Sequence, residues 1–117
     1  MNEIWAAFLN SWRGIRVAAA TERAVRQEFI LLAIAVPLSF LIGTTAWVRV
    51  ALVSTILLLL VAEFLNTAVE KLCDHVNPDH HPAIGRVKDF GSAAVFCALV
   101  IAGLVWGTAL FERVGVL

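Results

Sequence analysis

Three long apolar runs dominate the pattern of hydrophobic and polar residues along the chain. They cover about residues 29–48, 50–69 and 90–111, and only the middle run contains a charged side chain, that of Glu63. Twenty helical residues are about 30 Å long, which matches the hydrocarbon thickness of a bilayer. The pattern therefore predicts three transmembrane helices, with a tight turn near Arg49 and a longer loop over residues 74–86, where Asn77-Pro78 and Pro82 interrupt helical structure.

The first part of the chain, about residues 1–24, has a different pattern. Its large apolar side chains recur at helical spacing, at Ile4, Trp5, Phe8, Leu9, Trp12 and Ile15. Tryptophan and arginine on one amphipathic helix are typical of the headgroup layer. We expect a helix that lies on the membrane surface, followed by the polar octet Thr21–Glu28 as the approach to the first span.

Composition supports a membrane protein with a single all-α domain over residues 1–117. The chain is 61% hydrophobic and only 15% charged. A chain of this length cannot bury so much apolar surface in one core, so lipid is the expected solvent. The net charge of zero argues against a nucleic-acid partner, and Cys73 and Cys97 lie in apolar or helical surroundings that suggest no disulfide framework.

The basic residues are unevenly distributed between the two ends of the spans. Arg49 and Arg113 lie at one end, and the other seven lie with the amino terminus and the long loop. The positive-inside rule then predicts that the amino terminus and the loop are cytoplasmic and that the carboxyl terminus is outside.

A set of polar residues ends the second apolar run, and we call it the acidic stripe: Glu63, Asn66, Glu70 and Asp74. On a helix, Glu63 and Glu70 point within about 20° of each other and lie about 10 Å apart. A charge in hydrocarbon costs about 2.5–3.5 kcal/mol, so such a residue indicates a functional site. The spans place Glu63 inside the bilayer and Glu70 at its cytoplasmic boundary.

Further polar residues on the same side complete a candidate site for phosphate chemistry. Lys88 and Ser92 are one helical turn apart, with Asp89 beside them. Paired carboxylates suit Mg²⁺ that also binds phosphate oxygens, and a lysine neutralises phosphate charge during transfer. The depth of Glu63 suggests a general base for a lipid hydroxyl.

Other interpretations remain open from the residues alone. Glu63 and Asn66 could line an ion pathway in a small oligomeric transporter, or could be a polar pair that packs helices together. The spacing of Cys73, His75, His80 and His81 matches no usual zinc site. The chain contains neither a P-loop nor a dinucleotide-binding glycine motif.

Several motifs resemble the small trimeric integral-membrane diacylglycerol kinases of bacteria. They are Ser11-Trp12-Arg13-Gly14-Ile15-Arg16, Arg26-Gln27-Glu28, the acidic stripe, and Gly85-Arg86-x-Lys88-Asp89-x-Gly91-Ser92-Ala93-Ala94, with Trp106 beyond them. The resemblance covers nearly the whole chain. It implies a homotrimer of three-span protomers in the bacterial inner membrane, with active sites shared between subunits, and transfer of phosphate from Mg-ATP to diacylglycerol.

The same resemblance implies roles for individual residues. Glu63 matches the catalytic base, and Glu22 and Glu70 match the carboxylates that hold the divalent cation on ATP. The expected ATP contacts further include Asp79, His80, His81, Lys88 and Asp89, with Asn66, Asp74 and Ser92 supporting the centre. The expected lipid-binding residues, besides Glu63 and Ser92, are Ser11, Trp12, Arg49 and Trp106.

The chain departs from the family pattern in two places. The loop Asn77-Pro78-Asp79-His80-His81-Pro82 is richer in proline than the family pattern, and Glu3 and Asn10 replace basic and aromatic residues. Relatives with the same stripe phosphorylate undecaprenol, which is the alternative substrate. The Lys88-Asp89-Phe90-Gly91-Ser92 segment is closer to the diacylglycerol enzymes.

Overall fold

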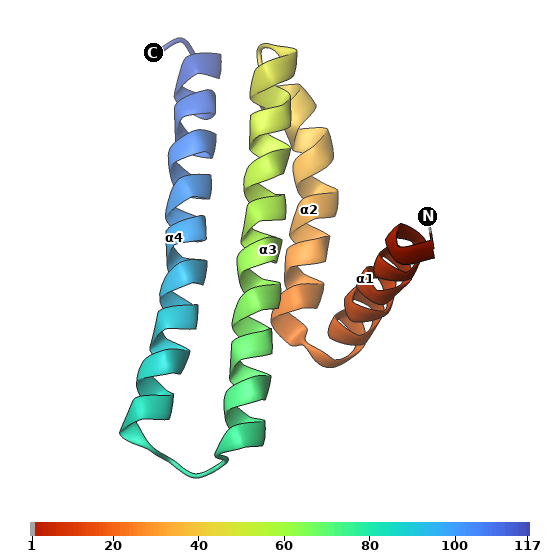
Figure 1. The fold of residues 1–117 in the computed structure, drawn as a ribbon. Helices are drawn as coiled ribbons and strands as arrows, with labels where there is room; N and C mark the ends of the chain where they lie inside the picture. Colours follow the sequence, from red (N-terminus) through yellow and green to blue (C-terminus); the bar gives the residue numbers. More distant parts are fainter. Residues whose placement is uncertain (1) are drawn as a thin grey trace.

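Four helices make up the structure, a computed structural model that describes residues 2–117. In chain order they are α1 (Asn2–Thr21), α2 (Arg23–Ile42), α3 (Ala46–Val76) and α4 (Pro82–Arg113). In Figure 1, α3 stands between α2 and α4, and α1 is inclined away from these three helices. The predicted all-α architecture with an amino-terminal helix is confirmed.

α2, α3 and α4 are each long and apolar enough to cross a membrane. Large apolar side chains point outward from all three, among them those of Phe40, Leu58 and Phe96. The buried core is small, and α3 contributes most of it through Leu52, Ile56, Leu59 and Leu60. An outward apolar surface around a small core is the pattern expected of helices that are solvated by lipid.

The turn between α2 and α3 corrects the prediction. It lies at Gly43–Thr45, not near Arg49, which is already in the first turn of α3. A Cβ on Gly43 would lie 2.6 Å from Cγ of Arg49, so the close approach requires glycine. Thr45 then caps α3, because its hydroxyl accepts a hydrogen bond from the backbone N–H of Val48 at 3.2 Å. The turn could not be located from the sequence, because residues 43–45 continue an uncharged apolar run.

The loop between α3 and α4 is also shorter than predicted. Residues 77–81 are non-helical, whereas Asp74 to Val76 complete α3 and α4 begins at Pro82. Pro82 suits the first helical position because it needs no N–H partner there. At about 46–48 Å, both helices exceed the hydrocarbon thickness, so their ends at this loop reach beyond it.

The break between α1 and α2 falls at Glu22, and the polar residues after it are helical. The guanidinium of Arg26 donates hydrogen bonds to the carbonyls of Ala19 and Ala20, both at 3.1 Å. These bonds satisfy carbonyls at the end of α1 that have no partner within the helix. α1 leaves Ile4, Trp5, Phe8 and Trp12 exposed.

Candidate functional site

The loop end of the bundle gathers most of the chain's polar side chains. We use this name for the end formed by the start of α2, the last turns of α3, residues 77–81 and the first turns of α4. The opposite end, at Gly43–Thr45 and the carboxyl terminus, is called the turn end. The loop end joins residues from α2, α3 and α4.

The acidic stripe lies on α3 as predicted, and its members contact neighbouring elements. The side-chain amide of Asn66 donates a hydrogen bond to Oε1 of Glu70 at 3.2 Å. Nζ of Lys88, from α4, donates to Oδ1 of Asp74 at 2.6 Å. The stripe is therefore connected along α3 and tied across to α4.

Glycine at position 91 allows α4 to approach the stripe. A Cβ there would clash with Oδ1 of Asn66, and that oxygen is buried without a hydrogen-bond partner. The side chain of Asn66 is thus confined between α4 and Glu70, and its amide orientation is fixed by the space that Gly91 leaves.

Glu22 reaches the same region from the break between α1 and α2. Its Oε2 accepts a hydrogen bond from the hydroxyl of Thr21 at 2.9 Å and lies 3.4 Å from Nζ of Lys71. Lys71 directly follows Glu70 on α3, so this ion pair brings Glu22 to the turn that carries Glu70.

The carboxylates of Glu22 and Glu70 fit a divalent cation that also binds phosphate. Over residues 2–117 there is no group of three or more His, Cys, Asp or Glu side chains able to hold a metal. Mg²⁺ commonly takes one or two carboxylates and completes its shell with water and phosphate oxygens. Since Asn66 occupies only Oε1 of Glu70, the other oxygen is free for such a cation.

The loop forms a pocket of about 210 Å³ beside the stripe. Asp79, His80, His81 and Lys88 all line it. Asn77 shapes the loop by accepting a hydrogen bond from the N–H of Asp79 at 3.1 Å, and His81 caps α4 through Nδ1 at 3.1 Å from the N–H of Ala83. Four residues predicted to contact ATP thus share one hollow, whereas Asp89 and Ser92 are exposed beside it.

An apolar groove of about 350 Å³ lies between α2 and α4, over α3. Its lining includes Leu31, Ile34 and Leu38 from α2, Ile56 from α3, and Gly103 and Trp106 from α4. Ile56 precedes Glu63 by two helical turns and shares its face, so the groove lies on the same side of α3 as the stripe, about 10 Å nearer to the turn end.

Trp106 lies in the wall of this groove, and its indole N–H forms hydrogen bonds within the same chain. The indole N–H donates to the carbonyl of Leu52 at 3.2 Å and to the hydroxyl of Thr55 at 3.0 Å. Only its apolar ring surface is therefore available to a lipid.

The other residues predicted to bind lipid are not brought to the stripe within one protomer. Arg49 is at the turn end, about 21 Å along α3 from Glu63, with its guanidinium 5.4 Å from the ring centroid of Phe40. Ser11 and Trp12 are exposed on α1, and the Ser11 hydroxyl donates to the carbonyl of Ala7 at 3.0 Å.

Two residues at the loop end were given no role in the sequence analysis. Lys71 pairs with Glu22, as described, and Glu28 on α2 meets Glu63 on α3. The polar octet contained Glu28, but the sequence alone gave no register between α2 and α3. Only the packing of the two helices identifies it.

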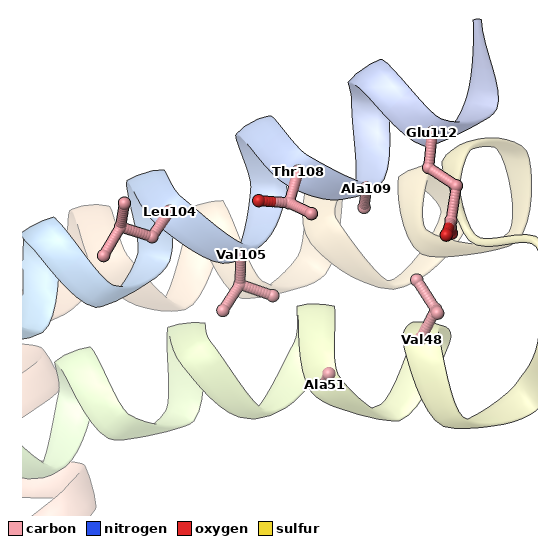
Figure 2. Close-up of a pocket in the computed structure, with 7 residues that line it drawn as sticks. All are labelled: Val48, Ala51, Leu104, Val105, Thr108, Ala109 and Glu112. Atoms are coloured by element: carbon pink, nitrogen blue, oxygen red, sulfur yellow. The ribbon is translucent and has the colours of Figure 1, made fainter. Parts of the chain in front are cut away.

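The turn end has a pocket of about 370 Å³, similar in volume to the apolar groove, but without a cluster of charged side chains. Figure 2 shows this pocket between α3 and α4, with Val48, Ala51, Leu104, Val105 and Ala109 among its lining residues. Its one charged side chain, Glu112, accepts a hydrogen bond from the hydroxyl of Thr44 at 3.2 Å. The phosphate chemistry inferred from the sequence has its residues at the loop end.

The chain is similar to a known family of proteins over most of its length. The family model for prokaryotic diacylglycerol kinase matches residues 9–110, which include α2, α3 with the whole stripe, and all of α4 except its last three residues. The chain belongs to the prokaryotic diacylglycerol kinase family. Members of this family are similar along most of the chain, as the following relatives show.

The diacylglycerol kinase of Haemophilus influenzae is 43% identical over 101 residues, which are 86% of this chain and 86% of the relative. The diacylglycerol kinase of Escherichia coli K12 is 37% identical over 105 residues, 90% of this chain and 86% of the relative. The diacylglycerol kinase of Pseudomonas aeruginosa is 36% identical over 105 residues, which are 90% of this chain and 80% of the relative. The resemblance stated from the motifs is confirmed.

Proposed function

We propose that this protein is an ATP-dependent lipid kinase that phosphorylates the primary hydroxyl of diacylglycerol and yields phosphatidic acid. The observation that carries the proposal is the position of Glu63 on α3, between the polar groups of the loop end and the apolar groove, which begins two helical turns away at Ile56. Family membership and the names of the relatives support the same activity.

The division of the site into two depths supports direct transfer between a water-soluble nucleotide and a membrane lipid. The pocket with Asp79, His80, His81 and Lys88 suits the nucleotide, and the groove suits acyl chains. The stripe bridges these two regions over about 10 Å of helix. A lipid whose chains occupy the groove presents its headgroup hydroxyl near Glu63.

In the proposed reaction, the lipid hydroxyl oxygen forms a bond to the γ-phosphorus of ATP as the bond from that phosphorus to the bridging oxygen of ADP breaks. The Glu63 carboxylate accepts the hydroxyl proton, and Asn66 orients Glu70 through their hydrogen bond. Glu22 and Glu70 would hold Mg²⁺, which neutralises charge on the phosphates when bound. Lys88, now on Asp74, can turn to the phosphates because the pair is partly exposed.

The resemblance supports the remaining parts of the proposal. We propose a homotrimer in the bacterial inner membrane, with the loop end in the cytoplasm, where ATP is available. With shared active sites, a neighbouring subunit would supply Ser11 and Trp12, which do not meet Glu63 within one protomer. Arg49 would lie at the turn end in every subunit, about 21 Å along α3 from Glu63.

The deciding experiment compares two lipid acceptors. Purified protein in mixed micelles receives Mg-ATP labelled in the γ-phosphate, together with dioleoylglycerol or undecaprenol. We expect label in phosphatidic acid, and label in undecaprenyl phosphate alone would overturn the substrate. Transfer to neither lipid would overturn the kinase proposal, and ion flux into liposomes without ATP would then identify a transporter.

A further inference from the structure

Two carboxyl groups face each other across the interface between α2 and α3. The side chains of Glu28 and Glu63 are within hydrogen-bonding reach. One residue further along each helix, the rings of Phe29 and Phe64 pack edge to face, with centroids 6.3 Å apart. The contact of the carboxyl groups is therefore fixed by the packing of two helices and does not depend on a flexible loop.

Among the described residues, no Lys, Arg or His side chain forms an ion pair with either carboxyl group. The two lysine–carboxylate ion pairs of the structure are those of Lys71 with Glu22 and Lys88 with Asp74, so neither lysine is available to the pair. Oε1 of Glu28 is buried and has no hydrogen-bond partner. Two carboxylates in contact in such a setting cannot both be ionised, so they share one proton.

The proton belongs on Glu28. Its unpartnered, buried oxygen is tolerated far better in a neutral carboxylic acid than in a carboxylate, which would need donors for all its lone pairs. A neutral Glu28 has one O–H donor, and the nearest acceptor is the Glu63 carboxylate.

We propose that Glu28 is a positioning residue for the base Glu63, and that its neutral carboxyl donates a hydrogen bond that fixes the orientation of the Glu63 carboxylate. This inference rests on the proposed function. The bond from Glu28 holds one oxygen of the Glu63 carboxylate and leaves the other free to accept the proton of the lipid hydroxyl. In the reaction, the hydroxyl proton moves to the second oxygen of Glu63, and the proton of Glu28 remains in place.

The kinetic test uses full-length protein with Glu28→Gln and Glu28→Leu. The exposed neighbour Gln27 provides the control Gln27→Leu. We expect Glu28→Leu to lower kcat at least tenfold, while KM for Mg-ATP stays within twofold. Glu28→Gln should keep kcat within about threefold of the unchanged protein, because the amide N–H replaces the O–H donor. The control should behave like the unchanged protein.

An infrared measurement tests the proton directly and requires no turnover. At neutral pH the unchanged protein should show the C=O stretch of a protonated carboxyl group. The band should disappear in Glu28→Gln, in which the protonated carboxyl group is absent. If Glu28→Leu fails to fold, the infrared band still shows whether Glu28 carries the proton.

Three results would overturn the inference: normal kcat in Glu28→Leu, equal loss of kcat in both Glu28 variants, or a protonated band that remains unchanged in Glu28→Gln. Failure of the proposed function looks different, because the unchanged protein would then transfer phosphate to no lipid while the infrared band of the pair persisted.

Discussion

The two ends of the bundle are built from the same helices but use their polar groups differently. At the turn end, polar side chains complete the backbone: Thr45 caps α3, and Thr44 links the turn to Glu112. At the loop end, Glu63, Asn66, Glu70 and Lys88 contact other side chains and cap no helix. Polar groups that cost free energy to bury and support no backbone are expected where function maintains them.

The two ends also differ in what a glycine allows the backbone to approach. Gly43 at the turn end allows the chain to reverse beside Arg49, and Gly91 at the loop end allows α4 to reach Asn66. The first serves the fold, because no other residue permits the turn. The second places an amide beside Glu70, and so serves the site.

The sharpest test of the comparison exchanges one carboxylate at each end for an amide. Glu63→Gln should lower kcat by about 10²–10⁴-fold, since the amide cannot accept the hydroxyl proton. Binding of Mg-ATP, measured by calorimetry, should be largely intact. Glu112→Gln at the turn end should leave kcat and the affinity for Mg-ATP within twofold of the unchanged protein. A loss of kcat as large as that of Glu63→Gln would contradict the functional distinction between the two ends.

Glu70→Ala tests the division of roles within the loop end. Removing this carboxylate should weaken Mg-ATP binding about tenfold or more, because the cation loses a ligand and Asn66 loses its acceptor. Titration of nucleotide at several Mg²⁺ concentrations measures the effect, with Glu3→Gln on the exposed face of α1 as the control. Equal loss of nucleotide binding in Glu63→Gln would refute the separate roles of the two carboxylates.

Gly91→Ala tests whether the approach of α4 positions Asn66. The added Cβ meets Oδ1 of Asn66 and should cost about 1–3 kcal/mol of stability, with a higher KM for Mg-ATP. Thermal unfolding in detergent and steady-state kinetics measure the two effects. Gly107→Ala on the same helix, where a Cβ meets nothing within 4 Å, is the matched control and should not be destabilised. Indistinguishable behaviour of the two variants would contradict the positioning of Asn66.

The smallest effect is expected at the turn end. Thr44→Val removes an exposed hydrogen bond to Glu112, which is worth at most about 1 kcal/mol. Thermal unfolding should change slightly, and kcat should not change. A large loss of activity would show that the turn end takes part in the reaction.

The number and type of the elements could be predicted because membrane helices leave a strong record in sequence. The apolar runs indicated three spans, and the spacing of Trp5, Phe8 and Trp12 indicated the amino-terminal helix. The helix ends were less accessible, because Gly43–Thr45 continues an uncharged run and its turn depends on the contact with Arg49. Hydropathy measures transfer into lipid and contains no information on where the backbone reverses.

The same limit applies to the site. Helical periodicity alone places Glu63, Asn66, Glu70 and Asp74 on one face of α3, since it depends only on 3.6 residues per turn. The partners of these residues come from other helices: Lys88 and Gly91 from α4, and Glu28 from α2. The sequence by itself determined the three spans and the stripe. Only the tertiary structure decided which side chains face it, because the register between packed helices is set by contacts distant in the chain.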